Sequence, residues 1–240
     1  MDLEAFANRI SFRYVGPAGG LRWYRRLNHR LAAVGVSLEV ANTRLPSDRR
    51  AARPALRRLV RGVPRMSTYA TAALIDKAVA AMPPDTSFVN VGLWHGFSFL
   101  AGLAGNPDRR CVGIDNFSQF GGPKAEFLAR FEAVRSPRHE FHEMDYEAYF
   151  AAVHQGPIGF YIYDGEHSYR NQLRGLEAAE PFFAPGCVVL VDDTNDDEPR
   201  QATLDFVNRH PGRYRMVFDR RTGVNGHPTF WNGVMAFVRT

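Results

Sequence analysis

Two short acidic segments hold the residues whose types and spacing could do chemistry. The sequence DGEH at 164–167 follows one apolar run, and DD at 192–193 follows another. If these runs are neighbouring parallel strands, their carboxyl ends bring Asp164, Asp192 and Asp193 into one small volume. Three such charges would raise one another's pKa unless a cation neutralises them, and a hard divalent ion takes oxygen ligands. The segments therefore predict a site for Mg²⁺ or another divalent cation.

The same residues leave other interpretations open. The stretch from Asp192 to Glu198 could instead cap and charge the first turn of the following helix. His167, three residues after Asp164, is either a general base or a helix-start histidine with a backbone partner. His227 is a second histidine that could compete with it as the base.

A glycine-containing turn offers a second place for a ligand. The sequence NVGLWHGFS at 90–98 ends an apolar run and leads into a helix, where backbone N–H groups can meet a polar ligand. The spacing of Gly92 and Gly96 is not the G-x-G-x-x-G that approaches a pyrophosphate, so it favours a ligand without phosphates. A tight turn would need glycine whatever it binds. Asp115, 23 residues after Gly92, could accept hydrogen bonds from a ribose diol.

The elements that must position these residues follow from the hydrophobic pattern beyond residue 84. Short apolar runs alternate with helix-length amphipathic segments, which predicts an α/β fold with a mainly parallel sheet. The last two runs are separated by a short glycine-rich link, so we expect a seven-stranded sheet whose last strand is antiparallel. The predicted strands are 87–91, 111–114, 139–144, 158–163, 187–191, 214–218 and 233–238.

The first 84 residues differ from the rest in pattern and charge. Apolar spacing predicts helices over 21–34 and 68–82, and a second basic stretch covers 53–65. Residues 1–84 hold 15 Lys and Arg against 5 Asp and Glu, whereas residues 85–240 hold 15 against 20. We therefore expect a basic helical cap or oligomerisation lobe at 1–84 and a ligand-binding domain at 85–240.

Composition sets the broad class. A chain of 240 residues with 45% hydrophobic and 23% charged residues suits a globular protein and excludes a collagen-like rod or a disordered tail. Cys111 and Cys187 lie inside apolar runs, which favours two buried thiols over a disulfide. The sequence has no apolar stretch of 18 residues and no signal-peptide pattern, so we expect a soluble cytoplasmic protein without a membrane partner.

Four segments together resemble class I S-adenosylmethionine-dependent methyltransferases. They are FVNVGLWHGFSFLAGL, CVGIDNF, FYIYDGEHSY and PFFAPGCVVLVDD. The likeness is greatest to the metal-dependent sugar O-methyltransferases of the macrocin type, and it covers about residues 85–240. The run D-G-x-H-x-Y with a later P-G and D-D is its more specific part. The resemblance implies a Rossmann-like fold that binds S-adenosylmethionine and Mg²⁺.

The resemblance also implies residue roles. Asp164, Asp192 and Asp193 would hold the metal, and His167 would be the base, with Asp164 beside it in the catalytic group. One glycine-turn residue departs from the family, because Asn90 stands where a Glu usually meets the ammonium of the cofactor. The residues implied for cofactor binding are Asn90, Gly92, Gly96, Ser98, Asp115, Asn116, Asp145, Tyr146 and Asp164.

The resulting hypothesis is methyl transfer from S-adenosylmethionine to a hydroxyl of a sugar or glycosylated small molecule, with a divalent metal orienting the acceptor. The alternatives are a metal-independent methyltransferase of another small molecule or RNA, and a non-catalytic cofactor-binding protein. The basic lobe could cap the acceptor site and make homo-oligomer contacts, attract a phosphorylated acceptor, or bind RNA or a membrane. We expect the first of these three, and no nucleic-acid partner. Acceptor choice is assigned to this lobe, to 116–124 and to 223–231.

Overall fold

The computed structural model describes residues 3–19, 21–32 and 35–240. Its centre is a seven-stranded sheet in the order β5-β4-β3-β6-β7-β9-β8. The five strands from β5 to β7 are parallel, and β9 runs antiparallel to both of its neighbours. The strands are β3 (Ser87–Val91), β4 (Arg110–Ile114), β5 (His139–His142), β6 (Ile158–Tyr163), β7 (Phe183–Asp192), β8 (Tyr214–Arg220) and β9 (Val234–Arg239).

The predicted fold class is confirmed. All seven predicted strands form, and the last strand in the chain is the antiparallel one. It does not lie at the edge, because β9 inserts between β7 and β8 and leaves β8 as the outer strand. The hairpin-like link between β8 and β9 makes this antiparallel pairing possible without a crossover helix.

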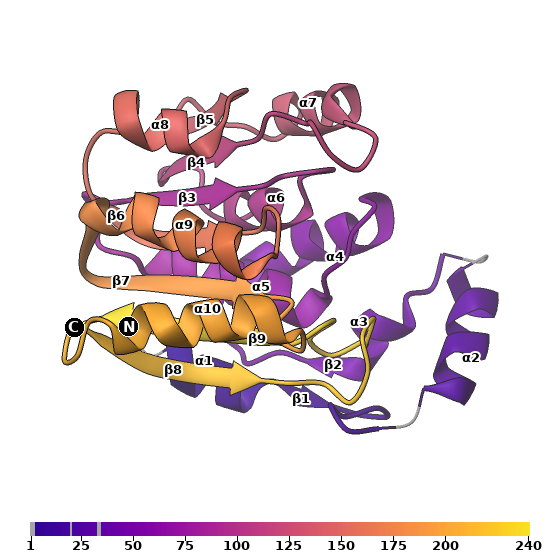
Figure 1. Ribbon diagram of the computed structural model, residues 1–240. Coiled ribbons are helices and arrows are strands. Elements are labelled where there is room, and N and C mark those ends of the chain that lie inside the picture. Colours follow the sequence, from indigo (N-terminus) through magenta and orange to yellow (C-terminus); the bar gives the residue numbers. More distant parts are fainter. Residues whose placement is uncertain (1–2, 20, 33–34) are drawn as a thin grey trace.

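Helices cover both faces of the sheet and give three layers (Figure 1). One hydrophobic cluster joins Phe88 and Phe160 to the helices on one face, and a second joins Val89 and Tyr161 to those on the other. Side chains alternate between the faces along each strand, so both faces are apolar and buried, as parallel sheets require. The covering helices are α5 (Tyr69–Ala81), α6 (Phe97–Leu103) and α7 (Lys124–Glu132) on one side, and α8 (Tyr146–Ala152), α9 (Tyr169–Ala179) and α10 (Asp197–Asn208) on the other.

The N-terminal part is mainly helical. Helices α1 and α4 share the first hydrophobic cluster with α5 and the sheet, whereas α2 packs on α3 and stands apart from the body in Figure 1. The division of the chain at residue 84 stays a prediction. The remaining elements are α1 (Leu3–Arg9), β1 (Ser11–Phe12), α2 (Arg22–Ala32), α3 (Leu38–Asn42), β2 (Thr43–Arg44), α4 (Arg53–Gly62), and the 3₁₀ turns η1 (Arg50–Ala52) and η2 (Glu180–Phe182). Val34, part of the predicted 21–34 helix, lies outside the described residues.

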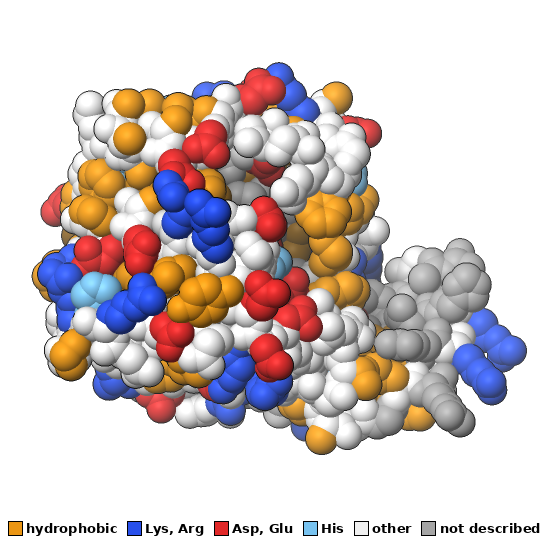
Figure 2. Space-filling model, in the orientation of Figure 1, with side chains coloured by type: hydrophobic (Ala, Val, Ile, Leu, Met, Phe, Trp, Pro, Cys, Tyr) orange, Lys and Arg blue, Asp and Glu red, His pale blue; other side chains and the backbone are white. Residues whose placement is uncertain are grey.

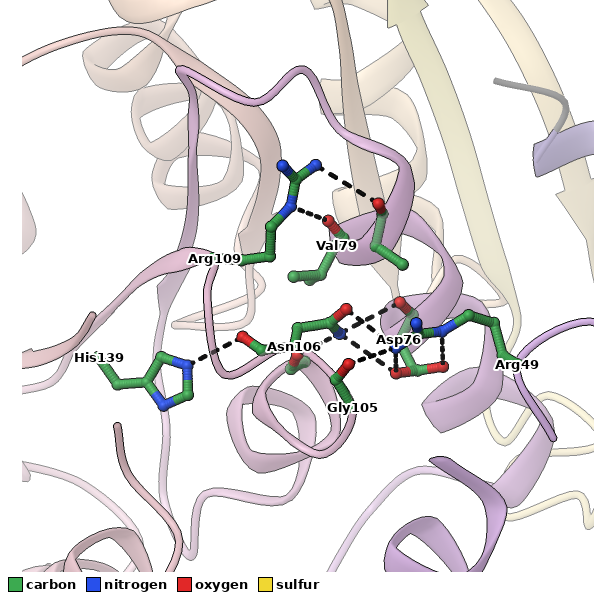
Figure 3. Close-up of polar contacts among 9 residues, drawn as sticks. Arg49, Asp76, Val79, Gly105, Asn106, Arg109 and His139 are labelled. Atoms are coloured by element: carbon green, nitrogen blue, oxygen red, sulfur yellow. Dashed lines mark hydrogen bonds and ion pairs between the residues drawn. The ribbon is translucent and has the colours of Figure 1, made fainter. Parts of the chain in front are cut away.

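A buried polar cluster ties the N-terminal segment to the sheet domain (Figure 3). The guanidinium of Arg49 donates to both carboxylate oxygens of Asp76, at 2.8 and 2.6 Å, and to the carbonyl of Gly105 at 2.8 Å. The Asp76 side chain is 1% exposed, and the Asn106 amide also donates to it. Because a bidentate pair fixes both distance and orientation, this cluster holds the chain before α4 against α5.

The state of the two cysteines agrees with the composition-based expectation. Cys111 and Cys187 are free and buried, as predicted. Among the described residues, no helix combines the length and apolar character that a membrane span needs.

Candidate functional site

A cavity of about 550 Å³ opens at the carboxyl ends of the parallel strands. Its walls include the residues after β3, β4 and β6, and β3 lies between β4 and β6. The chain leaves β3 towards β4 on one side and later returns to β6 on the other, so the cavity sits at the switch point of the strand order, where α/β folds bind ligands. In Figure 1 these strand ends point to the right.

Four titratable residues from two strand ends meet in this cavity and form what we call the acidic cluster: Asp164, His167, Asp192 and Asp193. The Nε2 atom of His167 lies 3.6 Å from Asp164 Oδ1, 3.8 Å from Asp192 Oδ1 and 3.6 Å from Asp193 Oδ2. Strands β6 and β7 pair in parallel, with Tyr163 opposite Val191, so the residues that follow them must emerge side by side. The sequence prediction of convergence is thus realised.

Local backbone features hold the cluster in place. Ser168 caps α9 by accepting from the Asn171 N–H, which starts the helix directly after His167. Asp193 has a φ of 51°, a left-handed conformation that a residue other than glycine adopts at some cost. Strain of this kind persists only where the surrounding structure imposes it, and it often marks functional positions.

The cluster perturbs its own titration. Burial lowers the pKa of His167, but the hydrogen bond to Asp164 and the charges of the two other carboxylates outweigh it and raise that pKa to about 10. Burial and the charge of Asp164 raise the pKa of Asp192 to about 8. Burial and the charge of Asp192 raise the pKa of Asp193 to about 7. Negative charge is therefore in excess here, and a cation would relieve it.

The donor atoms present suit a divalent metal. One ligand atom each from Asp164, His167 and Asp192 lie within 4.8 Å of one another. Asp192 Oδ1 and His167 Nδ1 are buried without a hydrogen-bond partner. This group of three mutually close ligand atoms includes His167 and not Asp193, which the sequence analysis had assigned as the third metal ligand. Mg²⁺ prefers oxygen ligands such as carboxylates, and it usually keeps further coordination positions for water or substrate oxygens.

The glycine turn approaches the cluster closely. Gly92 has a φ of 79°, and a Cβ there would lie 2.0 Å from the Asp164 carbonyl oxygen, so only glycine fits. Ser98 Oγ donates to Asp164 Oδ2 at 3.4 Å. Gly96 lies outside the cavity lining and starts α6 in a left-handed conformation against the Phe127 ring.

Asn90 lies inside the sheet rather than in the cavity lining. It is fully buried in β3, and its Nδ2 donates to the carbonyls of Val91 and Gly92. The roles of Asn90 and Gly96 towards a cofactor stay predictions.

Asp115 lines the cavity but already accepts three backbone N–H groups. Its Oδ2 accepts from Leu93 and Trp94 at 2.7 and 3.0 Å, and its Oδ1 accepts from Phe117 at 2.7 Å. A carboxylate offers about four acceptor sites, so one remains for a ligand hydroxyl. These three hydrogen bonds hold the loop after β3 and the loop after β4 around the Asp115 carboxylate.

The other predicted cofactor residues also line the cavity. Asn116 accepts from the Ser118 N–H, and Asp145 caps α8 by accepting from two backbone N–H groups. Tyr146 packs edge-to-face on Tyr163. Ile114 and Met144 line the same cavity. The roles of these residues towards a cofactor stay predictions.

The structure adds cavity residues that the sequence did not single out. Arg65, Met66 and Ser67, between α4 and α5, form one wall. The segment 116–124, assigned to acceptor choice, does reach the lining, where Phe120 stands 70% exposed. The segment 223–231, assigned to acceptor choice, is not part of the lining. His227 is fully buried outside it and contacts Thr229 Oγ1 at 2.7 Å, so it does not compete as the base.

The sheet order, the three layers and the ligand cavity at the switch point define a Rossmann-like methyltransferase fold. Residues 89–194 match a family model described as a methyltransferase domain. That segment spans β3 to β7 and contains the whole acidic cluster. A search of curated protein sequences returned no significant match.

Solved structures share this fold over most of the chain. A protein of Corynebacterium glutamicum has 16% identity and a TM-score of 0.58, with 91% of this chain and 98% of that chain covered. A cofactor-bound protein of MTB has 18% identity and a TM-score of 0.56, with coverages of 89% and 95%. An O-methyltransferase of Bacillus cereus in complex with SAH has 14% identity and a TM-score of 0.57, with coverages of 90% and 97%.

Proposed function

We propose that this protein transfers a methyl group from S-adenosylmethionine to a hydroxyl of a sugar or glycosylated small molecule, with a divalent cation orienting the acceptor. The observation that carries the proposal is the acidic cluster on the wall of the cavity, where three carboxylates meet with His167 Nε2 within 3.8 Å of each. The methyltransferase-domain match over residues 89–194 supports the reaction class. The O-methyltransferase of Bacillus cereus supports transfer to oxygen.

Two groups of residues divide the work. Residues after β3 and β4, with Tyr146 and Asp145, would bind the adenosine and methionine parts of the methyl donor. Asp164, Asp192 and Asp193 would hold the cation. When bound, the donor supplies an activated methyl on a sulfonium, and the cation supplies the positive charge that lowers the pKa of an acceptor hydroxyl.

His167 would take the proton of the acceptor hydroxyl at Nε2, the ring atom that faces the carboxylates. With the carboxylates uncompensated, the raised pKa of His167 keeps it protonated at neutral pH. A protonated imidazole holds a proton but cannot accept one. His167 therefore works as a base only when the charge of the cluster is balanced. Positioning would do the rest, because the methyl donor and the acceptor would be held in one cavity.

A second candidate is a metal-independent methyltransferase. One observation favours it, since protonated His167 itself pairs with all three carboxylates and cancels part of their charge. In that case the cluster would be a structural ion network, and the acceptor would be held by other groups.

The experiment that tests the proposal is transfer of tritiated methyl from S-adenosylmethionine to a panel of sugars and glycosides. The expected result is transfer with Mg²⁺, none with EDTA, and none by the Asp192→Asn/Asp193→Asn variant. Asp85→Asn, an exposed carboxylate outside the cavity, is the control and keeps full transfer. Transfer that is unchanged by EDTA would favour the metal-independent candidate. Homo-oligomeric assembly and a cytoplasmic location stay predictions.

A further inference from the structure

The cavity carries more negative charge than a metal site needs. Besides the acidic cluster, four carboxylates line it, from Asp115, Asp145, Glu147 and Glu166. Glu147 pairs with Arg174, and Glu166 accepts a hydrogen bond from the Asn171 amide. Figure 2 shows further acidic side chains gathered over the start of α10, and the shallow hollow that shares His167 with the cavity is lined by Asp196, Asp197 and Glu198.

The one arginine in the described cavity lining is already neutralised. Arg65 Nη2 lies 2.8 Å from Glu39 Oε2, and Glu39 is only 8% exposed. The Tyr69 N–H also donates to Glu39, which fixes the carboxylate from the helix side. The guanidinium lies over the Phe97 ring at 5.5 Å. Arg65 therefore forms part of the cavity wall, and its positive charge is paired with the buried carboxylate of Glu39 rather than free to bind an anion.

The described part of the basic N-terminal segment contributes few residues to the cavity lining. Among the residues that the structure describes before α5, only Arg65, Met66 and Ser67 belong to its lining. Arg9 pairs with Asp48, and Arg49 pairs with Asp76. Within the described part of the chain before α5, the basic side chain that lines the cavity is Arg65, and it is paired with Glu39.

Bound ligands would not cancel the excess. Seven carboxylates line the cavity, and they face Arg174, a divalent cation and the net single positive charge of the methyl donor, while His167 is neutral when it acts as the base. Counting each at full charge, with Arg65 and Glu39 as a neutral pair, leaves about three negative charges. Low-dielectric walls strengthen the field of those charges inside a cleft.

We propose that the acceptor carries no negative charge, so that phosphorylated and nucleotide-linked acceptors are excluded by the field of the cavity. This inference rests on the proposed function for the identity of the reaction and deepens it by naming the charge class of the acceptor. Like charges brought together across an interface are strongly disfavoured. A phosphorylated acceptor is expected to bind at least about a hundred-fold more weakly than its unphosphorylated partner.

Fluorescence quenching of Trp94 by charged ions reports the electrostatic potential in the cavity without any methyl transfer. Trp94 lines the cavity and is half-buried, so small quenchers reach it. The Trp23→Phe/Trp231→Phe protein has Trp94 as its sole tryptophan. Its fluorescence is measured with saturating Mg²⁺ and S-adenosylmethionine, no acceptor, and constant ionic strength, with caesium, iodide and acrylamide as quenchers. After normalisation to free tryptophan, caesium is expected to quench about threefold more efficiently than iodide.

Charge-neutralising variants sharpen the test. In the same background, Glu147→Gln/Glu166→Gln should move the caesium-to-iodide ratio most of the way to one, because it removes about two of the three negative charges. Glu132→Gln, on the exposed side of α7, should leave the ratio unchanged. Equal quenching by caesium and iodide in the parent protein, or faster methylation of a phosphorylated acceptor than of its unphosphorylated partner, would overturn the proposal. Absence of any methyl transfer would overturn the proposed function but leave the quenching result standing.

Discussion

Replacing one carboxylate of the acidic cluster should make the metal-free protein more stable. Asp193→Asn keeps the shape of the side chain and removes its charge. Burial and the charge of Asp192 raise the pKa of Asp193 from 3.8 to about 7, so above pH 7 the folded protein holds a carboxylate that is better accommodated in the unfolded chain. At 1.36 kcal/mol per unit, that shift corresponds to an upper bound of about 4 kcal/mol.

Solvent reduces this figure. The Asp193 side chain is 23% exposed, and water screens part of the repulsion. We therefore expect Asp193→Asn to raise the free energy of unfolding by about 2 kcal/mol at pH 8, which for a chain of this length raises Tm by about 4 to 8 °C. The gain should be absent near pH 4, because the carboxylate is then protonated in the folded state. It should grow between pH 4 and 7 and stay constant above.

The assay is thermal unfolding in EDTA, followed by circular dichroism at pH 4, 6 and 8. Asp85→Asn is the matched control, since Asp85 is exposed and lies outside the cavity, and it should change stability by less than about 0.5 kcal/mol. Adding Mg²⁺ should stabilise the parent protein and not Asp193→Asn. A variant that is no more stable than the parent at pH 8, or a gain that is equal at pH 4 and pH 8, would refute the reasoning.

Three further outcomes are expected. Gly92→Ala should abolish binding of S-adenosylmethionine in a titration, because its Cβ would lie 2.0 Å from the Asp164 carbonyl; Gly212→Ala, with a similar φ of 78° and open space, should bind normally. Asp76→Ala should lower the free energy of unfolding by about 3 to 5 kcal/mol in urea, since it leaves a half-buried guanidinium unpaired, and a loss below about 1 kcal/mol would contradict the anchoring role. Burial lowers the pKa of His154 to about 4, so the folded state resists its protonation and stability should fall as pH drops from about 6.5 to 4. His154→Gln should make unfolding less sensitive to pH over that range, and an unchanged pH profile would show that the imidazole is not responsible.

The strands were predictable because their composition is local. Apolar β-branched and aromatic runs such as 187–191 become buried strands wherever the sheet covers both faces. The acidic cluster was predictable for a related reason, since polar residues directly after neighbouring parallel strands must share one edge of the sheet. Asp164 follows β6 and Asp192 ends β7, and the pairing of those strands brings them together.

Features that depend on distant packing were not predictable. Arg65 reaches the cavity because Glu39, 26 residues earlier, holds its guanidinium, and no local pattern encodes that pair. The insertion of β9 beside β7 depends on antiparallel pairing across the whole strand, not on the short link before it. Segment 223–231 looked like an acceptor loop, but it folds back on itself through the bridge between His227 and Trp231.

The central claim is that the acidic cluster holds a divalent cation in a methyl-donor site. Its most direct test is calorimetric titration of Mg²⁺ into EDTA-treated protein that has been dialysed free of chelator and saturated with S-adenosylmethionine. The account predicts one Mg²⁺ bound per chain, with binding lost in Asp192→Asn/Asp193→Asn while the affinity for S-adenosylmethionine is kept. Binding of S-adenosylmethionine with no Mg²⁺ uptake, or equal Mg²⁺ uptake by the variant, would contradict it.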